Sequence, residues 1–325
     1  MKLATLDTGG DGTLLIVSRD LTRAARAEAA PTLQAALANW EAAEPALRRQ
    51  ADAIEAGTSE TMAVDSLALA AVLPRSYQFL DASAFLAHNH ILARAWGFEP
   101  RGEAEPPLMY QGLSDRFYAP HAPVPFRGFD GDEVDFEAEY GVITDAVPMG
   151  ISPRDALGHA RLLIIINDWS LRAFGPSEMR GGFGFLHAKP PSTLSSIAVT
   201  PDELGDDWHA GRVHLPLQVH LNGTFFGSPT GAAMHFGFGD LIAHAAMTRS
   251  LCAGTLIGSG TVSNYDADIV GSACIAERRA LDVVAKREPT PYLRANDHVA
   301  IAALDNRGEP IFGIIAQKVV TIGPA

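Results

Sequence analysis

The N-terminal part of the chain shows two successive hydrophobic patterns. Apolar residues dominate 2–6 and 13–18 on either side of a glycine-rich stretch, 7–12, which predicts a β-hairpin. From 31 to 57 they recur at helical spacing, as Leu33, Leu37 and Trp40 and, after Pro45, as Leu47, Ala51 and Ile54, with Gly57 as a stop. No grouping of catalytic side chains accompanies them. We therefore predict a small N-terminal α/β cap domain over residues 1–73.

Residues 74–325 have a different texture, with short apolar runs, many Gly and Pro, and few long helical patterns. Ser152, Pro153 and Asp155 form a helix-start signature, and a buried strand follows at 162–166, ending at Asn167 and Asp168. A second helix is predicted over 240–252, with Gly254 beyond it. Further strands are predicted at 255–263, 272–277 and 313–322. The pattern indicates an α+β fold or a mixed β-roll.

Length and charge narrow the classes of protein. A chain of 325 residues suggests about two domains. Its formal net charge is -13 and its pI about 5.2, so an acidic surface would repel nucleic acid and anionic membranes, and we expect neither as a partner. The longest apolar runs, 67–73 and 162–166, are too short to span a bilayer.

The two cysteines, Cys252 and Cys274, lie far apart and have no neighbouring cysteine that would form a disulfide framework or a zinc pair. The first ten residues show no apolar signal segment. We therefore expect two reduced thiols in a cytoplasmic protein.

The stretch VDFEAEYGVI at 134–143 carries the first candidate chemistry. If it is a strand, Glu137 and Glu139 share one face, where two carboxylates repel each other. Asp168 and Asp81 in FLDASAFLAHNH add two more oxygen donors without any accompanying cysteine. Such a set suits a hard cation such as Mg²⁺ or Ca²⁺, which would relieve the repulsion. From spacing alone, a solvated sheet face remains the alternative.

Four motifs occur in an order that resembles the fumarylacetoacetate hydrolase family. They are LDASAFLAH, FEAEYGVI, NDWSLR followed by GFGFLHAKPPST, and GTLIGSGTVS. The resemblance covers roughly residues 73 to 320, and the N-terminal part resembles the extra domain of the longer members. It implies a catalytic domain over 74–325, a β-rich roll enclosing a metal, and usually a homodimer.

The resemblance also implies a ligand set and a substrate class. One divalent cation, Mg²⁺ or Ca²⁺ with Mn²⁺ as a further candidate, is held by four carboxylates: Asp81, Glu137, Glu139 and Asp168. Family members act on small 2,4-dioxo or 2-oxo acids that chelate the metal, so we expect such an acid as the partner of this chain.

Three residues take catalytic roles by the same resemblance. His88 stands seven residues after Asp81, where hydrolase members carry the histidine that activates water. Glu277 is the candidate that orients this histidine, with a plain surface acid as the alternative. Lys189 follows GFGFLHA and would place a fixed positive charge where an oxyanion develops. His90 has no such match and is expected to be structural.

Tyr110, Thr261 and Arg172 match substrate-contacting positions, although Arg172 also fits a structural pair with an acid. The chain departs from the family where the far end of the substrate would bind. Ala173 and Gly175 stand where hydrolase members carry an acid and a glutamine, and the arginine that grips a distal carboxylate has no clean match, Arg94 being misplaced. Ile91 replaces the glutamate that many short members carry three residues after the histidine.

The sequence thus predicts a metal-dependent hydrolase that cleaves a carbon–carbon bond in a 2,4-dioxo acid of the fumarylacetoacetate or acylpyruvate type, as in aromatic amino-acid catabolism. One alternative is a hydratase, isomerase or decarboxylase of small 2-oxo dicarboxylic acids on the same scaffold. A second is a non-catalytic, metal-dependent binder of dicarboxylates.

Overall fold

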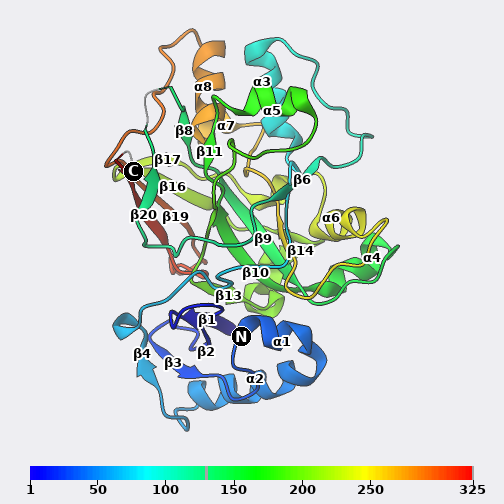
Figure 1. Cartoon of the computed structure of the whole chain (residues 1–325), viewed down its shortest axis with the longest axis vertical. Coiled ribbons are helices and arrows are strands. Elements are labelled where there is room, and N and C mark those ends of the chain that lie inside the picture. The colour runs from blue at the N-terminus through cyan, green and yellow to red at the C-terminus, as the bar shows by residue number, and fades with distance from the viewer. Residues whose placement is uncertain (129–130, 324–325) are drawn as a thin grey trace.

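The computed structural model describes residues 1–128 and 131–323. Within them, eleven strands form the largest sheet, which starts in the N-terminal region and continues through the rest of the chain (Figure 1). Its order is β4 (Met62–Ala63), β3 (Arg23–Arg26), β2 (Thr13–Val17), β1 (Lys2–Leu6), β13 (Ile197–Val199), β10 (Ala160–Asn167), β9 (Ala138–Thr144), β18 (Leu256–Gly258), β5 (Phe79–Ala82) and β6 (Met109–Gly112), with β12 (Thr193–Leu194) also paired to β10.

A second sheet has five strands in the order β17 (Thr224–Gly227), β16 (Leu217–Leu221), β19 (His298–Ala303), β20 (Ile315–Thr321) and β7 (Val124–Phe126). Two short pairs complete the described strands: β8 (Val134–Asp135) with β11 (Ser170–Leu171), and β14 (Trp208–His209) with β15 (Arg212–Val213). The predicted α+β class and mixed β-roll are confirmed.

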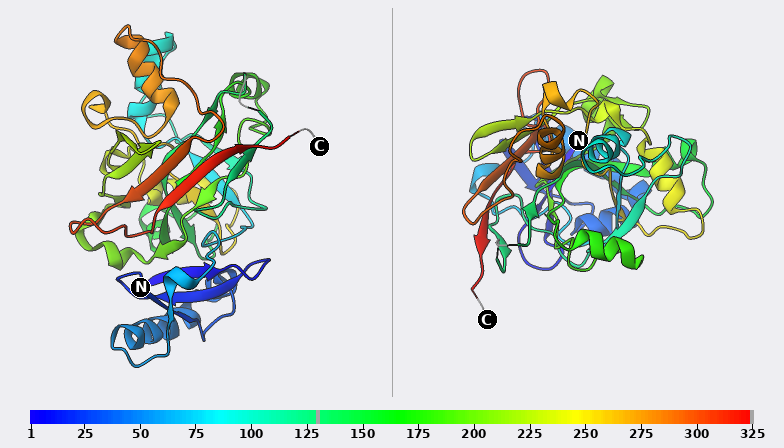
Figure 2. Two further views of the ribbon diagram at one scale, coloured as in Figure 1. Left: turned by 90° about the vertical axis from the view of Figure 1, so that its left-hand side faces the viewer. Right: turned by 90° about the horizontal axis from the view of Figure 1, so that it is seen from above.

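The helices lie around these sheets. They are α1 (Leu33–Ala38), α2 (Trp40–Glu55), α3 (Leu86–Trp96), α4 (Pro153–Ala156), α5 (Gly175–Gly181), α6 (Phe238–Ala245), α7 (Ala267–Val270) and α8 (Ile275–Val284), with 3₁₀ turns η1 (Val64–Ser66), η2 (Leu157–His159), η3 (Pro201–Asp207) and η4 (Gly231–Ala233). Helices α3 and α8 pack together at the end of the molecule opposite the N-terminal region (Figures 1 and 2). No helix within 1–128 and 131–323 is long and apolar enough to cross a membrane.

Strand β10 explains why one sheet can join two regions. Its side chains alternate between faces, so Leu163 and Ile165 enter one hydrophobic core while Ile164 and Ile166 enter another, which includes Leu33 of α1. β1 reaches β10 through β13, with Lys2 opposite Val199. The domain boundary at residue 73 stays a prediction.

The N-terminal hairpin is confirmed, since β1 and β2 pair antiparallel around the glycine-rich turn. The helical stretch divides at Asn39 rather than at Pro45, which lies inside α2. Thr32 caps α1 by accepting a hydrogen bond from the N–H of Ala35, and Gly57 ends the region with a positive φ of 70°.

Two predicted elements are wrong in part. The helix expected over 240–252 starts earlier and is shorter, since it spans only α6. Asp240 is not its first residue but lies in its first turn, where its carboxylate accepts a hydrogen bond from the N–H of Gly237. Beyond Ala245 the chain turns away, and Leu251 pairs with Val147 through both backbone hydrogen bonds. The strand expected over 255–263 is confirmed only for β18, since Gly260 turns the backbone at φ 77°.

The strand predicted at 272–277 is wrong, because α8 begins there. Cys274 is the N-cap, and its Sγ accepts from the N–H of Glu277 at 3.3 Å. Cys274 forms only an isolated bridge with Glu137. The strand predicted at 313–322 is confirmed as β20.

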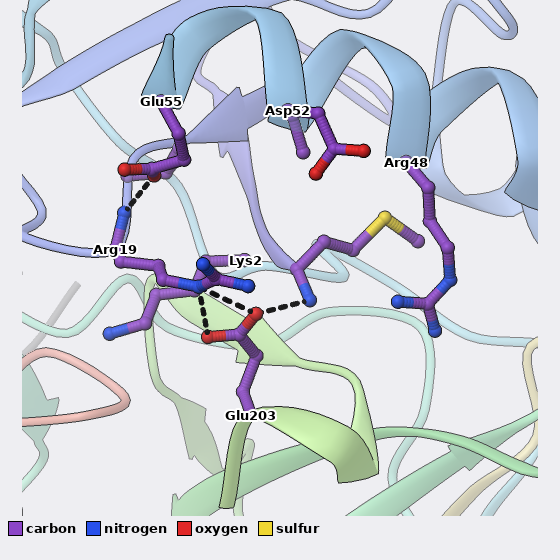
Figure 3. A pocket seen from close by; sticks show the side chains of 9 residues that line it. Lys2, Arg19, Arg48, Asp52, Glu55 and Glu203 are labelled. Carbon is purple, nitrogen blue, oxygen red and sulfur yellow. Dashed lines mark hydrogen bonds and ion pairs between the residues drawn. The ribbon is translucent and has the colours of Figure 1, made fainter.

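A cavity of about 150 Å³ lies between α2, β1 and η3 and is lined mostly by charged side chains (Figure 3). Arg19 reaches across it to the carboxylate of Glu203 at 3.3 Å, and Arg48 at its edge forms two hydrogen bonds of 3.0 Å to Asp202. These contacts between arginines of the N-terminal region and acids of η3 join the two parts.

Candidate functional site

Three strands of the largest sheet bring three carboxylates together. Asp81 lies in β5, Glu139 in β9, and Asp168 directly after β10. β18 runs between β5 and β9, and its Gly258 pairs with Asp81. A Cβ on Gly258 would come within 2.3 Å of Asp81 Oδ1 and 2.9 Å of Glu139 Oε2. The glycine therefore leaves the space in which two acids from separate strands meet.

Asp81, Glu139 and Asp168 each offer a carboxylate oxygen, and these oxygens lie within 4.8 Å of one another. All three side chains are buried. Across the described part of the chain, no donor reaches Asp81 Oδ1 or either oxygen of Glu139. Burial, and then the charge of Asp168, raises the pKa of Asp81 to about 7, and burial followed by Asp81 raises the pKa of Glu139 well above its usual range.

This arrangement fits a divalent cation. Buried acceptors without donors are costly, and a cation with oxygen ligands removes that cost while neutralising the repulsion. Asp81, Glu139 and Asp168 would hold it.

Glu137, expected as the fourth ligand, lies beside this trio but is occupied by cations of the chain. Its Oε1 lies 2.5 Å from Arg172 Nη2, its Oε2 3.1 Å from Lys189 Nζ, and Ser170 donates to Oε1 at 3.0 Å. Burial alone would raise the pKa of Glu137, but Arg172 and Lys189 outweigh burial and hold that pKa below its ordinary range. Glu137 is thus an ionised carboxylate at the edge of the trio.

Lys189 links these acids. Its Nζ lies 2.5 Å from Asp168 Oδ2 as well as 3.1 Å from Glu137. Burial alone would lower the pKa of Lys189, but Asp168 and Glu137 raise it above its usual value. The amine is therefore a positive charge at the side of the carboxylate trio, and its role toward a developing oxyanion stays a prediction.

Tyr110 in β6 also faces Asp168. Its hydroxyl donates to Asp168 Oδ2 at 2.8 Å, and its ring meets Phe185 edge-on at 4.9 Å. Ser192 donates to the other oxygen, Oδ1, at 2.5 Å. Sequence reasoning missed Ser192, because nothing in PPST distinguishes this serine from an ordinary loop residue.

His88 and Glu277 form a pair between α3 and α8. His88 Nδ1 lies 2.8 Å from Glu277 Oε2, and the Glu277 side chain is fully buried while that of His88 is 15% exposed. With Nδ1–H donating to the carboxylate, Nε2 is free to accept a proton. The surface-acid alternative for Glu277 therefore does not hold. Once protonated, His88 would also lower the pKa of Glu137, which ties the pair electrostatically to the acid cluster.

The remaining candidates lie close by in sequence but have other contacts. Arg172 is held by two acids, Asp135 at 2.9 Å and Glu137, which agrees with the structural pair considered as its alternative. Thr261 is buried just after Gly260, in the turn that follows β18. His90 contacts the carbonyl of Arg101 and the hydroxyl of Tyr265, both at 3.2 Å.

Comparison with known proteins shows the family of the chain. The model for the fumarylacetoacetate (FAA) hydrolase C-terminal domain matches residues 79–320. The chain therefore belongs to the fumarylacetoacetate hydrolase family. Residues 1–75 match the model for fumarylacetoacetase N-terminal domain 2, so it is one of the longer members. No curated protein sequence matched the chain.

Solved structures show the same fold. Fumarylacetoacetate hydrolase from Exiguobacterium antarcticum superposes with a TM-score of 0.70 at 16% identity, covering 99% of this chain and 100% of that one. Maleylpyruvate hydrolase from Sphingobium sp. SYK-6, in complex with manganese(II) and pyruvate, gives 0.67 at 17% identity with both chains fully covered. 5-Carboxymethyl-2-hydroxymuconate delta-isomerase from Mycobacterium smegmatis gives 0.63 at 16%, again over the whole of both chains.

Proposed function

We propose that the protein is a metal-dependent hydrolase that cleaves a carbon–carbon bond in a 2,4-dioxo acid. The observation that carries the proposal is the His88–Glu277 pair, at 2.8 Å, together with a trio of buried carboxylates in which Asp81 Oδ1 and both oxygens of Glu139 lack a donor among the described residues. A cation alone suits many reactions of oxo acids. A histidine with a buried carboxylate partner adds a base that can take a proton from water.

The dioxo group would chelate the bound cation, Mg²⁺, Ca²⁺ or Mn²⁺, and the cation would polarise it. The chain supplies the proton transfers. His88 Nε2 accepts a proton from water, and Glu277 stabilises the imidazolium that results. The hydroxide adds to the distal carbonyl carbon, and Lys189 offsets the charge that develops on its oxygen. The carbon–carbon bond then breaks, and its electron pair leaves on the oxo-acid fragment, which takes up a proton.

Another reaction on the same scaffold is the second candidate, because the delta-isomerase from Mycobacterium smegmatis shares this fold over its whole length. An isomerase, a hydratase or a decarboxylase of small 2-oxo dicarboxylic acids would use the cation without hydrolytic cleavage. A non-catalytic binder would use it without any turnover.

A substrate panel in H₂¹⁸O separates these reactions. Acylpyruvates, fumarylacetoacetate and 2-oxo dicarboxylic acids would be incubated with Mg²⁺, Mn²⁺ or Ca²⁺, and the products analysed by mass spectrometry. Hydrolysis places ¹⁸O in the carboxylate of the released acid, hydration places it in a hydroxyl, and decarboxylation releases CO₂. Dioxo acids that remain uncleaved while 2-oxo dicarboxylic acids react would replace the hydrolase by its alternative.

We further propose that the protein works as a homodimer, as its resemblance to the family implies. Analytical ultracentrifugation with and without Mg²⁺ tests this, and a monomer under both conditions would contradict it.

A further inference from the structure

The proposed reaction requires the His88–Glu277 pair to stay at a fixed place beside the carboxylate trio, although the two lie on different elements. We infer that Asp135, a residue to which no role is assigned, is the positioning residue that holds them together. It lies in β8, two residues before Glu137, and is fully buried. The inference rests on the proposed function for its catalytic consequence, but not for its structural one.

Both oxygens of Asp135 accept hydrogen bonds from the start of α8, and one of them also accepts from Arg172. Oδ1 accepts from the N–H groups of Ile275 at 2.7 Å and Phe136 at 2.8 Å. Oδ2 accepts from the N–H of Ala276 at 2.9 Å and from Arg172 Nε at 2.9 Å. A carboxylate with four donors has one orientation in which all are satisfied.

On one side, Asp135 fixes the start of α8. Ile275 and Ala276 are the first two residues of this helix, and their N–H groups have no partner within it. A negative charge at this end is favoured by the helix dipole. Glu277 is the next residue, so the hydrogen bonds to Asp135 set where the Glu277 carboxylate projects. That carboxylate in turn holds the imidazole of His88.

On the other side, Asp135 fixes Arg172. The guanidinium lies 2.9 Å from Asp135 Oδ2 and 2.5 Å from Glu137 Oε1, so it bridges the two acids. Glu137 contacts Lys189, and Lys189 contacts Asp168 of the trio. Every link from His88 to Asp168 is thus a direct hydrogen bond, an ion pair or a single turn of helix. Asp135 is the residue in this series of contacts that binds both the start of α8 and Arg172.

Asp135→Asn is the test, because asparagine keeps the size but replaces one acceptor oxygen by an NH₂ group. Wherever that group points, it meets a donor, either an N–H of α8 or the guanidinium of Arg172. Without its anchor, α8 shifts relative to the trio. We expect kcat on an acylpyruvate to fall about 10- to 100-fold, the size typical of losing a residue that orients others. KM and the affinity for Mn²⁺ should change less than about threefold.

The readout that does not depend on activity is the His88 imidazole in ¹H–¹⁵N NMR spectra. In the native protein we expect a downfield Nδ1–H protected from exchange by Glu277, and in Asp135→Asn an upfield, faster-exchanging one. Asp145→Asn is the matched control. Asp145 is also a buried acid, but its hydrogen bonds and ion pairs among the described residues are to Arg161, at 2.6 Å, and His159, neither of which belongs to the site.

An unchanged His88 resonance in folded Asp135→Asn would overturn the inference, and so would an equal change in Asp145→Asn, which would reduce Asp135 to a general structural acid. If Asp135→Asn does not fold, the His88 resonance can be measured in Arg172→Lys instead. This variant keeps the positive charge but loses the planar guanidinium that binds two acids at once. If native protein cleaves no dioxo acid, the proposed function fails, whereas the NMR comparison still decides the role of Asp135.

Discussion

Two clusters of charge in this protein differ in how their carboxylates are balanced. At the contact between the N-terminal region and η3, Glu203 faces Arg19 (Figure 3), and Asp202 is hydrogen-bonded to Arg48. Burial would raise the pKa of Asp202, but the hydrogen bonds from Arg48 and Thr200, together with the charges of the N-terminal amine and Arg48, outweigh burial and lower that pKa. In the carboxylate trio the direction is reversed, since the pKa values of Asp81 and Glu139 are raised.

The difference separates a structural cluster from a functional one. Acids that each have a cation of the chain need nothing further, and they fasten two regions together. Acids buried without donors are tolerated only where a ligand completes them. Lys189 and Arg172 partly balance the second cluster, but they reach Asp168 and Glu137 and leave Glu139 without a donor among the described residues.

The largest expected effect is that of Glu139→Gln. It should weaken Mn²⁺ binding more than about 100-fold, beyond the 10- to 100-fold loss typical of a residue that only supports a ligand. Stability without metal should not fall, because glutamine removes a charge that burial and Asp81 disfavour, as the raised pKa of Glu139 indicates. Calorimetric titration and melting curves check both. A cation at 100 times its Kd adds about 2.7 kcal/mol to native stability, and the variant should lose this increment. If Glu139→Gln bound Mn²⁺ as tightly as the native protein, the contrast between a structural cluster and a metal-binding one would be wrong.

Next is His88→Ala. Loss of a general base costs roughly 10²- to 10⁴-fold in rate, so kcat should fall by that amount. Mn²⁺ affinity should stay within about threefold, because His88 contacts Glu277 and none of the three grouped carboxylates. Steady-state kinetics with a metal titration tests the split. Activity retained in this variant would favour an isomerase or decarboxylase.

Lys189→Met should lower kcat about 10²-fold, the loss typical of one oxyanion donor. Binding of oxalate, a ground-state analogue, should weaken much less, because the lysine acts mainly on charge that develops during the reaction. Equal losses in kcat and oxalate affinity would show that Lys189 only holds the substrate. No loss in either would remove it from the site.

The smallest effect should come from the structural cluster. Asp202→Asn breaks a pair whose side chains are 40% and 51% exposed, so the free energy of unfolding should fall by no more than about 1 kcal/mol, with kcat unchanged. Because the pKa of Asp202 is lowered on folding, its stabilisation is present above the ordinary value of 3.8 and declines as the pH falls below it. Denaturant titrations of both proteins at pH 7 and at acid pH test this. If the difference in the free energy of unfolding between the native protein and Asp202→Asn increased as the pH fell, the predicted direction would be wrong.

The sequence determined those parts of the protein whose cause is local. The glycine-rich turn and alternating apolar residues specified the β1–β2 hairpin, Ser152 and Pro153 specified the start of α4, and the apolar run before Asn167 specified β10. The ordered motifs located His88, Lys189 and the acids, since a resemblance needs no coordinates. The order of residue types in a motif can be compared between proteins without knowing which residues are in contact in space.

Only the tertiary structure decided what each charge contacts. The segment 272–277 reads as a strand, yet Asp135, distant in sequence, accepts the N–H groups that start α8 there. Glu137 and Glu139 look equivalent in sequence, but Arg172 and Lys189 contact the first, while the second has no donor among the described residues. Long-range pairing of this kind depends on which strands become neighbours, and hydrophobic periodicity specifies only which face of a strand is buried.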